Sequence, residues 1–368
     1  MRLLIPGYKS KRRVFSLALD SPTLDDLNSE GVETVFVNDD SITIYPDGGL
    51  IPCEGKLIDT LSACNNYDVF AFFEDGTAIR YYDDSSSDTT LFITGQCNSN
   101  CIMCPSPNLS RKEYDVNDID LLIEVIGHIP KDTPHMTITG GEPFMVGKGI
   151  FDLIEACKRK FTETDFLILT NGRVFAVSEY CRMLHETIPN KCLIGIPLHG
   201  SCADIHDSIT QANGSFDQTL LGLKRLQALG VSTEIRIVVS RLNLGDLENT
   251  AKLISSELAS VTHVTFVAME MTGSAQINAE QVWISYKESF PEVRRAIDIL
   301  VECGIDVRIY NYPICTVDPD MRMLCCKSIS DYKVRFSKEC EKCNEKESCS
   351  GVFAGTLNRE VDELRAII

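Results

Sequence analysis

The sequence predicts an α/β protein whose largest part is a parallel sheet covered by helices. Between about residues 89 and 310, six strand-like segments are each followed by a segment with the apolar spacing of a helix. Parallel neighbours need crossover connections, so this alternation favours parallel strands. A β-prone segment precedes this region and a cysteine-dense segment follows it. We therefore expect three parts, at residues 1–86, 87–310 and 311–368.

The composition is that of a folded protein that is not a general nucleic-acid binder. Of 368 residues, 44% are hydrophobic and 24% are charged, and the net charge is −18. An acidic surface does not attract phosphate backbones or anionic lipid. We find no signal peptide and no apolar run near the roughly 20 residues that span a bilayer, so we expect a cytoplasmic protein. Sixteen cysteines are many for such a protein, and in a reducing compartment they favour metal ligands or reactive thiols over disulfides.

The first part is predicted to be a small β-rich domain. Residues 34–37 and 42–45 are short β-prone runs, and residues 69–73 and 77–82 are expected to form a hairpin around an Asp-Gly turn. The polar, serine-rich residues 83–88 are the predicted linker.

The second part supplies the sheet and its helices. The predicted strands are residues 91–94, 135–139, 166–170, 193–198, 234–239 and 263–269. The predicted helices are residues 118–129, 151–160, 174–184, 216–229, 247–258 and 291–303. A closed or partly closed barrel and an open doubly wound sheet both fit this order. In either fold the ligand site belongs at the carboxyl ends of the strands.

Three cysteines follow the first predicted strand of the sheet. Cys97, Cys101 and Cys104 have the spacing C-x3-C-x2-C. Three thiolates on a tight loop can hold three irons of a cubane cluster and leave the fourth iron open. An open position is typical of a catalytic metal site. The alternative is a zinc-binding loop, but a zinc ion would need a fourth Cys or His, and none follows within the loop.

Two further segments stand at the ends of the next two strands. Gly140, Gly141 and Glu142 precede a proline, and glycines at a strand end let a ligand approach the backbone closely. The Glu142 carboxylate can accept a hydrogen bond from an ammonium group, although an ordinary glycine turn would look the same. Asn171 and the glycine after it end the third strand.

Together, the three segments resemble the radical S-adenosylmethionine (SAM) enzymes, whose defining motif is C-x3-C-x-φ-C with an apolar or aromatic φ. The resemblance implies a partial (β/α)6 TIM-type barrel and a 4Fe–4S cluster on the three cysteines. It also implies that Met103, at the φ position, packs near the cofactor adenine. Gly140, Gly141 and Glu142 would contact the methionine amino group, and Asn171 belongs to the family's TNG segment.

The fourth and fifth strands depart from the family pattern. Pro197 stands where many relatives have a serine for the ribose or carboxylate of the cofactor. His199 is a candidate to take over part of that contact, although a lone histidine is more often structural. Arg236 is a candidate partner for the methionine carboxylate, and a pairing within the fold is the equal alternative. The sequence assigns no catalytic residue.

The third part is predicted to bind a second metal centre and to end in a helix at residues 358–368. Cys340, Cys343 and Cys349 have the spacing C-x2-C-x5-C, and Cys315 would complete four thiolates. Four thiolates suit a closed zinc site or a fully ligated 4Fe–4S cluster. We favour the cluster over zinc and over free thiols. Cys325 or Cys326 could replace Cys315. The segment resembles a shortened SPASM/twitch-like auxiliary-cluster tail of peptide-modifying radical SAM enzymes.

The most specific resemblance is to the His-Xaa-Ser system radical SAM maturases of the C subfamily. It rests on residues 214–220, 271–273, 309–311 and 327–332. It implies a ribosomally made peptide or protein substrate with His-Xaa-Ser repeats, an electron donor and a second maturase. The expected reaction is reductive cleavage of SAM to a 5′-deoxyadenosyl radical, which abstracts hydrogen from the substrate. The alternatives are a radical SAM enzyme acting on a small molecule or nucleotide, and a zinc-binding interaction protein.

Overall fold

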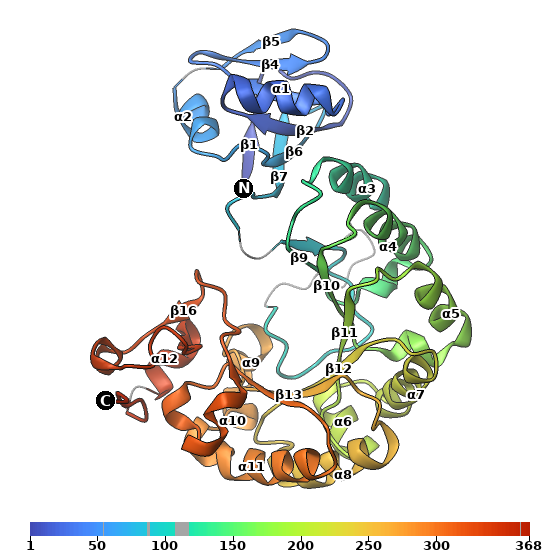
Figure 1. The fold of residues 1–368 in the computed structure, drawn as a ribbon, viewed down its shortest axis with the longest axis vertical. Helices are drawn as coiled ribbons and strands as arrows, with labels where there is room; N and C mark the ends of the chain where they lie inside the picture. Colours follow the sequence, from blue (N-terminus) through green and yellow to red (C-terminus); the bar gives the residue numbers. More distant parts are fainter. Residues whose placement is uncertain (54, 87–88, 107–117, 361) are drawn as a thin grey trace.

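The computed structural model contains two large sheets that lie one after the other along the chain (Figure 1). It describes residues 1–53, 55–86, 89–106, 118–360 and 362–368. The last two residues of the predicted linker, 87 and 88, lie outside these ranges. The division of the chain at residues 86 and 310 stays a prediction.

The N-terminal sheet has seven strands in the order β1-β7-β6-β2-β3-β4-β5. All neighbours are antiparallel except β2 and β3, which are parallel and therefore need the crossover helix α1. The hairpin of β6 and β7 and the strands β3 and β4 agree with the sequence pattern, which predicts neither helix of this part. The bounds are β1 Arg2–Leu4, β2 Arg13–Ala18, α1 Ser21–Ser29, β3 Thr34–Val37, β4 Ser41–Tyr45, β5 Gly49–Pro52, α2 Lys56–Ser62, β6 Val69–Phe72 and β7 Thr77–Tyr82.

The second sheet is an open, parallel, barrel-type sheet whose eight strands follow the chain order from β8 to β15. Because the order never reverses, the sheet has no switch point and is not doubly wound. Figure 1 shows its helices along the outer side of a curved sheet. The strands are β8 Thr90–Phe92, β9 His135–Thr139, β10 Asp165–Leu169, β11 Cys192–Pro197, β12 Thr233–Val238, β13 His263–Val267, β14 Val307–Tyr310 and β15 Cys325–Cys326.

The barrel helices bury one apolar face each against the sheet, and several differ in extent from the prediction. The segment predicted as a helix from residue 174 is a 3-10 turn, η2 (Arg173–Ala176), followed by α5. The helix predicted from residue 291 begins earlier, because Ser285 caps the Glu288 N–H. The helices are α3 Ile119–His128, α4 Gly149–Lys160, α5 Ser178–Thr187, α6 Ala203–Thr210, α7 Ser215–Ala228, α8 Leu247–Glu257, α9 Gly273–Ile277, α10 Ala279–Val282 and α11 Tyr286–Glu302.

The N-terminal sheet packs on the barrel through α3. Val14, Val69 and Ala71 belong to the same buried apolar cluster as Leu122 and Val125 of that helix. The opposite face of the N-terminal sheet has its own apolar core. The two parts therefore share a buried interface that holds α3 between them.

In the tail after β14, the predicted terminal helix is wrong. The helix α12 spans Ala354–Glu360, and residues 362–368 have no helical structure. The Ile367 N–H instead donates to Cys343 Sγ at 3.4 Å, and the Ile367 carbonyl accepts from the Asn344 N–H. These tertiary bonds take the place of helical ones. The tail also contains η4 Ile314–Thr316, η5 Pro319–Leu324, β16 Val334–Arg335, η6 Lys338–Lys342 and β17 Val352–Phe353.

Among the helices that the structure describes, none combines the length and the apolar character needed to cross a lipid bilayer.

Candidate functional site

The cysteine triplet lies on the loop after β8, at the carboxyl end of the barrel strands. Cys97, Cys101 and Cys104 are each half-buried. The loop is held by backbone hydrogen bonds to the end of α6, because the N–H groups of Asn100 and Ile102 donate to Thr210 and Ile209 carbonyls at 2.9 Å. The thiols are thus carried by a loop whose backbone is fixed on the barrel.

The other side of the loop is pinned by α9 and its neighbours. The Ser274 N–H donates to the Cys104 carbonyl at 2.9 Å, and the Asn278 amide donates to the Ile102 carbonyl at 3.0 Å. Met103 is 5% exposed and lies in a small apolar cluster with Ile209 and other residues of this wall. The loop geometry is therefore set by contacts with distant parts of the chain.

Gly140 and Gly141 lie against the backbone of the cysteine loop. A Cβ at Gly140 would lie 2.5 Å from the Thr94 carbonyl oxygen, and one at Gly141 would lie 2.3 Å from the Gln96 carbonyl oxygen. The Gly141 N–H donates to the Thr94 carbonyl at 2.7 Å. The close backbone approach expected at these glycines is thus an approach to the loop itself.

Glu142 is buried and joins the ends of β9 and β10. Its carboxylate accepts from Thr170 Oγ1 at 2.8 Å, from the Asn171 N–H at 2.7 Å and from the Phe144 N–H at 3.1 Å. Burial raises the pKa of the Glu142 carboxyl, and these donors, with Arg173, oppose the rise. A carboxylate has about four acceptor positions, so most of its capacity is used within the protein.

Asn171 connects this carboxylate to the cysteine loop. Its side-chain amide donates to Asn98 Oδ1 at 2.6 Å. Arg173 strengthens the same connection by donating to Ser99 Oγ at 3.1 Å and to the Asn98 carbonyl. The ends of β9, β10 and the cluster loop are therefore one hydrogen-bonded unit.

A cavity of about 470 Å³ lies beside the triplet at the mouth of the barrel. It brings together five of the residues singled out in the sequence: Cys101, Met103, Cys104, His199 and Arg236. Cys97, Gly140, Gly141, Glu142 and Asn171 are not part of its lining.

His199 has a buried ring nitrogen without a hydrogen-bond partner. The residue is 3% exposed, and its Nδ1 finds no partner among the described residues. Its ring stacks on His206 with 5.6 Å between the centroids. Burial, followed by the charge of His206, lowers the pKa of His199 to about 3. The imidazole is thus neutral at the edge of the cavity, and Asn243 holds its backbone carbonyl at 3.1 Å.

Arg236 points into the barrel interior, where it has partners of its own. Its guanidinium lies 3.5 Å from Glu234 Oε2 and 5.5 Å from the centre of the Tyr310 ring. It lines the cavity beside the triplet as well. Arg236 therefore both pairs with Glu234 within the fold and lines the cavity beside the triplet.

The tail supplies one wall of the cavity. No local sequence pattern predicts this wall. Ser328, Ile329, Ser330, Lys333 and Phe353 all line it. Lys333 forms an ion pair of 3.4 Å with Glu270, which lies after β13. Only the family resemblance of residues 327–332 signalled this segment, because a loop that closes over a cavity has no periodic pattern.

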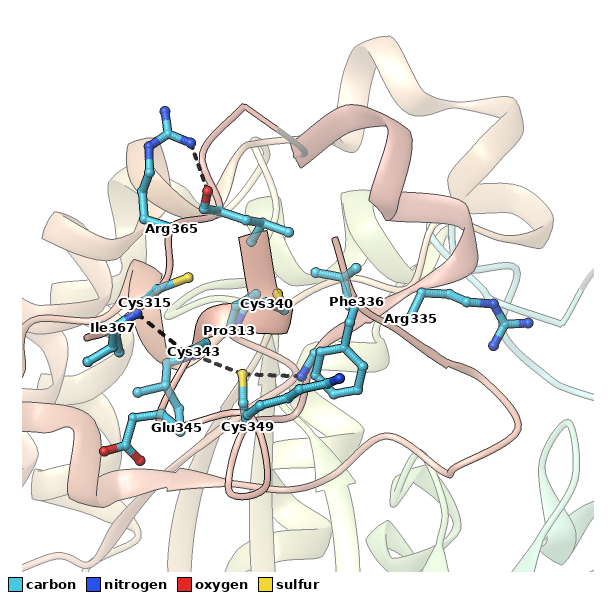
Figure 2. Close-up of a pocket in the computed structure, with 15 residues that line it drawn as sticks. Pro313, Cys315, Arg335, Phe336, Cys340, Cys343, Glu345, Cys349, Arg365 and Ile367 are labelled. Atoms are coloured by element: carbon cyan, nitrogen blue, oxygen red, sulfur yellow. Dashed lines mark hydrogen bonds between the residues drawn. The ribbon is translucent and has the colours of Figure 1, made fainter. Parts of the chain in front are cut away.

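The tail cysteines surround a second, much smaller cavity of about 20 Å³. Figure 2 shows Cys315, Cys340, Cys343 and Cys349 around it, although they come from η4, from η6 and from the loops that follow. Burial raises the pKa of the Cys315 and Cys349 thiols. The four sulfurs that the spacing singled out therefore do meet in space.

Three of these four sulfurs accept a hydrogen bond from a backbone N–H group, and the fourth lies beside a hydroxyl group. Cys349 Sγ accepts the N–H groups of Ile314 and Gly351, each at 3.4 Å. Cys343 Sγ accepts the Ile367 N–H at 3.4 Å. Cys315 accepts the backbone N–H of Arg365, and Cys340 Sγ lies 3.5 Å from Ser337 Oγ. Donors aimed at sulfur are the arrangement that tunes metal-bound thiolates.

Cys325 and Cys326 do not line this cavity. They alternate across β15, and Cys326 pairs with Tyr310 of β14, whose side chain faces the barrel interior. Cys325 packs on the apolar core, and burial raises the pKa of its thiol to about 12. Of the three alternatives for a fourth tail ligand, Cys315 is the one that joins the other cysteines.

The residues around the triplet fit the group that the triplet implies. In the described part of the chain, no three His, Cys, Asp or Glu side chains converge on a single ion position. The ligands of a cubane bind different irons, so they need not converge in that way. Cys101 and Cys104 reach a roomy cavity at the strand ends, where such a group and its ligand belong.

Comparison with known proteins agrees with this geometry. Residues 91–254 match the model of the Radical SAM superfamily. The AdoMet-dependent heme synthase of Oleidesulfovibrio alaskensis is 24% identical over 197 residues, which cover 52% of this chain and 47% of the relative. The antilisterial bacteriocin subtilosin biosynthesis protein AlbA of Bacillus subtilis is 29% identical over 117 residues, or 32% of this chain and 25% of AlbA.

A solved structure shares the fold. Streptococcus suis SuiB bound to its precursor peptide SuiA superposes with a TM-score of 0.50 at 13% identity, over 60% of this chain and 48% of SuiB. The chain spans about half the length of the first curated relatives that it matches. Residues 91–254 therefore match the radical SAM superfamily, whose enzyme fold binds a 4Fe–4S cluster and S-adenosylmethionine.

Proposed function

We propose that the chain is a radical SAM maturase that modifies a ribosomally made peptide or protein. The observation that carries this proposal is the tail, in which four cysteines line one cavity and three of their sulfurs accept backbone N–H groups. A cysteine-rich tail of this kind is what the resemblance ties to peptide-modifying enzymes. The similarity to AlbA, a bacteriocin biosynthesis protein, supports the same substrate class.

In the proposed enzyme, Cys97, Cys101 and Cys104 hold the cluster that binds SAM. When bound, this cluster and SAM supply a 5′-deoxyadenosyl radical that abstracts a hydrogen atom from the substrate. The protein residues bind, orient and exclude water. Met103 offers an apolar contact for the adenine, and the neutral imidazole of His199 offers an unpartnered nitrogen to a polar group of the cofactor.

The segment from Gly140 to Glu142 and Asn171 have a positioning role in this proposal. They fix the cysteine loop, and Glu142 keeps about one acceptor position for the methionine amino group. Arg236 is the candidate for the methionine carboxylate. The tail wall around Ser330 and Lys333 closes the cavity over the reacting groups.

Cys315, Cys340, Cys343 and Cys349 are the proposed ligands of a second 4Fe–4S cluster. The cavity between them has about 20 Å³, which is close to the space of one water-sized group. A cubane therefore requires the loop that carries these cysteines to open, and a zinc ion requires the sulfurs to move closer together, because no three side chains of the described residues converge on one ion position. Counting the iron bound to the tail distinguishes a 4Fe–4S cluster from zinc.

The finer assignment within this proposal is the C subfamily of His-Xaa-Ser system maturases. It rests on the resemblance of residues 214–220, 271–273, 309–311 and 327–332. In that assignment the substrate is a protein with His-Xaa-Ser repeats, and an electron donor and a second maturase are the other partners.

A small-molecule substrate is the second candidate. The heme synthase of O. alaskensis and an Fe-coproporphyrin III synthase of Methanosarcina barkeri, both 24% identical to this chain, favour it. A cavity of about 470 Å³ is also large enough for a small molecule. Incubation with a His-Xaa-Ser repeat peptide and with Fe-coproporphyrin III separates the two candidates, because only the true substrate should be converted.

The first experiment replaces Cys97, Cys101 and Cys104 together with alanine. We expect the anaerobically reconstituted variant to lose one cluster's iron and all 5′-deoxyadenosine formation. A matched control replaces Cys157, a fully buried core thiol outside both cysteine groups, with alanine. Undiminished 5′-deoxyadenosine from the triple variant would contradict the proposal.

The second experiment counts the iron that remains in that triple variant by Mössbauer spectroscopy. About four irons per chain should remain if the tail holds a 4Fe–4S cluster. Further replacement of Cys343 and Cys349 with alanine should remove them. Zinc in their place would make the tail a structural site, and no metal at all would remove the main argument for a peptide substrate.

A further inference from the structure

A second large cavity occupies the lower half of the barrel, at the end of the strands opposite the cysteine triplet. It has a volume of about 660 Å³ and is lined at its rim by residues at or before the amino ends of the strands, among them His135, Asp165 and Lys191. The interior of a closed (β/α)8 barrel is normally filled by bulky branched side chains. This sheet is open, and side chains leave the lower half of its concave face accessible to a ligand.

The inner wall of this cavity is charged. Glu234, Arg236, His263, Arg308 and Tyr310 all line it, and they come from three consecutive strands, β12, β13 and β14. Alternation along these strands turns the five side chains to the same face of the sheet. Gly195 on β11 lies beside Glu234. A Cβ at this glycine would lie 3.3 Å from Glu234 Oε2 and 2.9 Å from Leu169 Cδ2.

The charges of this wall do not balance. Glu234 is 1% exposed; it accepts from Thr265 Oγ1 at 2.6 Å and lies 3.5 Å from Arg236. Arg308 is exposed, bonds to the Tyr310 hydroxyl and lies within the influence of the Glu234 charge, but among the described residues it forms no ion pair of its own with a carboxylate. Two guanidinium groups thus face one carboxylate, inside a chain whose net charge is −18.

A buried histidine at the same wall lacks close hydrogen bonds. His263 is 2% exposed, and among the described residues neither of its ring nitrogens has a hydrogen-bond partner at normal distance. Its Nε2 lies 3.6 Å from Glu234 Oε1, which is too long for a hydrogen bond. Buried polar atoms are almost always satisfied, so this wall has unused capacity for a ligand.

We propose that the lower half of the barrel is a second binding subsite that takes a carboxylate group of the substrate, held by Arg308 and the Tyr310 hydroxyl. One unpaired guanidinium matches one carboxylate, whereas a phosphate dianion would bring an excess of negative charge. The planar guanidinium fork fits a carboxylate with two parallel hydrogen bonds.

The position of Arg236 connects this subsite to the upper cavity. Arg236 lines both cavities. A substrate with its carboxylate below this side chain therefore extends toward the cysteine triplet above it. As a substrate subsite, this inference rests on the proposed function. It adds that the substrate segment that enters the barrel carries a carboxylate, either on an acidic side chain or at the end of the chain.

The test is calorimetric titration of the full-length, anaerobically reconstituted protein with small probes at constant ionic strength. N-acetyl-glutamate amide carries a side-chain carboxylate, N-acetyl-alanine carries a chain-end carboxylate, and N-acetyl-glutamine amide is the neutral isostere. We expect saturable binding of at least one carboxylate probe, and binding of the neutral probe that is about tenfold or more weaker. The carboxylate probe that binds more tightly shows whether the substrate's carboxylate belongs to an acidic side chain or to a chain end.

Variants locate the binding. Arg308→Gln should weaken carboxylate binding about tenfold or more, and Arg308→Lys should lie between this variant and the natural protein because it keeps the charge without the fork. The control is Arg182→Gln, on the exposed face of α5, which should bind as the natural protein does. Far-UV circular dichroism checks each fold, and Arg308→Lys alone carries the test if Arg308→Gln does not fold.

The inference would be overturned by no saturable carboxylate binding, by equal binding of the neutral probe, by no loss in either Arg308 variant, or by tighter binding of inorganic phosphate. Displacement of the probe by SAM would also overturn it, because the carboxylate would then occupy the position of the cofactor. Cleavage of SAM is measured on the same preparation. A protein that cleaves SAM but ignores the carboxylates refutes this subsite alone, and one that binds them without cleaving SAM refutes the proposed function alone.

Discussion

At the scale of single residues, Glu142 shows that a side chain near a cofactor site can hold the surrounding backbone in place. Its carboxylate accepts three hydrogen bonds from the ends of β9 and β10 while it is 2% exposed. Each of these donors would be buried without a partner if the carboxylate were removed. The residue is therefore a structural pin of the site as well as a candidate cofactor contact.

Replacing Glu142 with alanine should therefore destabilise the protein by about 2–4 kcal/mol, because buried donors lose their acceptor. Glu142→Gln should cost less, because its amide oxygen still accepts. The measurement is the urea midpoint of each variant, read with an unchanged slope. Equal midpoints for the alanine and glutamine variants would show that the three hydrogen bonds do not hold the site together.

At the scale of elements, the sequence was sufficient wherever a local pattern repeats. The barrel strands from β8 to β13 and most helices lie within a few residues of their predicted positions, since apolar periodicity reports burial directly. The strand β14 was missed because it is four residues long and carries Arg308 on its inner face. The terminal helix failed because Arg365 and Ile367 give their N–H groups to cysteine sulfurs.

The residues of the candidate site also fall into two groups, those that a local sequence pattern predicts and those that it does not. Spacing singled out the triplet and the tail cysteines, because metal ligands on one loop leave a local signature. It gave no sign of the tail wall at Ser330 and Lys333, or of the partners of Arg236. Those depend on which distant segments the fold brings together, and a single sequence has no local record of that.

The turn after β9 supplies a prediction at this scale. A Cβ at Gly141 would lie 2.3 Å from the Gln96 carbonyl oxygen, so Gly141→Ala must displace the cysteine loop. We expect a loss of about 2 kcal/mol or more in stability and reduced iron at the triplet. The matched control is Gly127→Ala on α3, where a Cβ meets nothing within 4 Å and should stabilise the helix slightly. Iron analysis showing full loading in Gly141→Ala would mean that the loop tolerates the shift.

At the scale of the whole molecule, the N-terminal sheet and the barrel are joined through α3. Arg12 pairs with Glu124 at 3.0 Å and with Asp118, and apolar residues of β2 and β6 pack on the same helix. At the end of α3, His128 Nδ1 lies 3.2 Å from Ser16 Oγ of β2. A titratable group therefore stands at the contact between the two sheets.

This contact makes stability depend on pH in a defined window. Burial lowers the pKa of His128 from 6.5 to about 4, with Glu33 opposing the shift and Lys160 adding to it. Between these values the unfolded chain binds a proton that the folded chain does not, so stability falls as the pH falls from about 6.5 toward 4.

The expected size follows from the same shift. Between pH 7 and pH 5 the natural protein should lose about 2 kcal/mol more stability than His128→Gln, at about 1.4 kcal/mol for each pH unit below 6.5. His185→Gln, which replaces an exposed histidine of α5, should keep the pH dependence of the natural protein. The measurement is urea unfolding at the two pH values, followed by circular dichroism. If His128→Gln shows the same loss as the natural protein, the proton is taken up elsewhere, and the junction between the N-terminal sheet and the barrel is not what acid weakens.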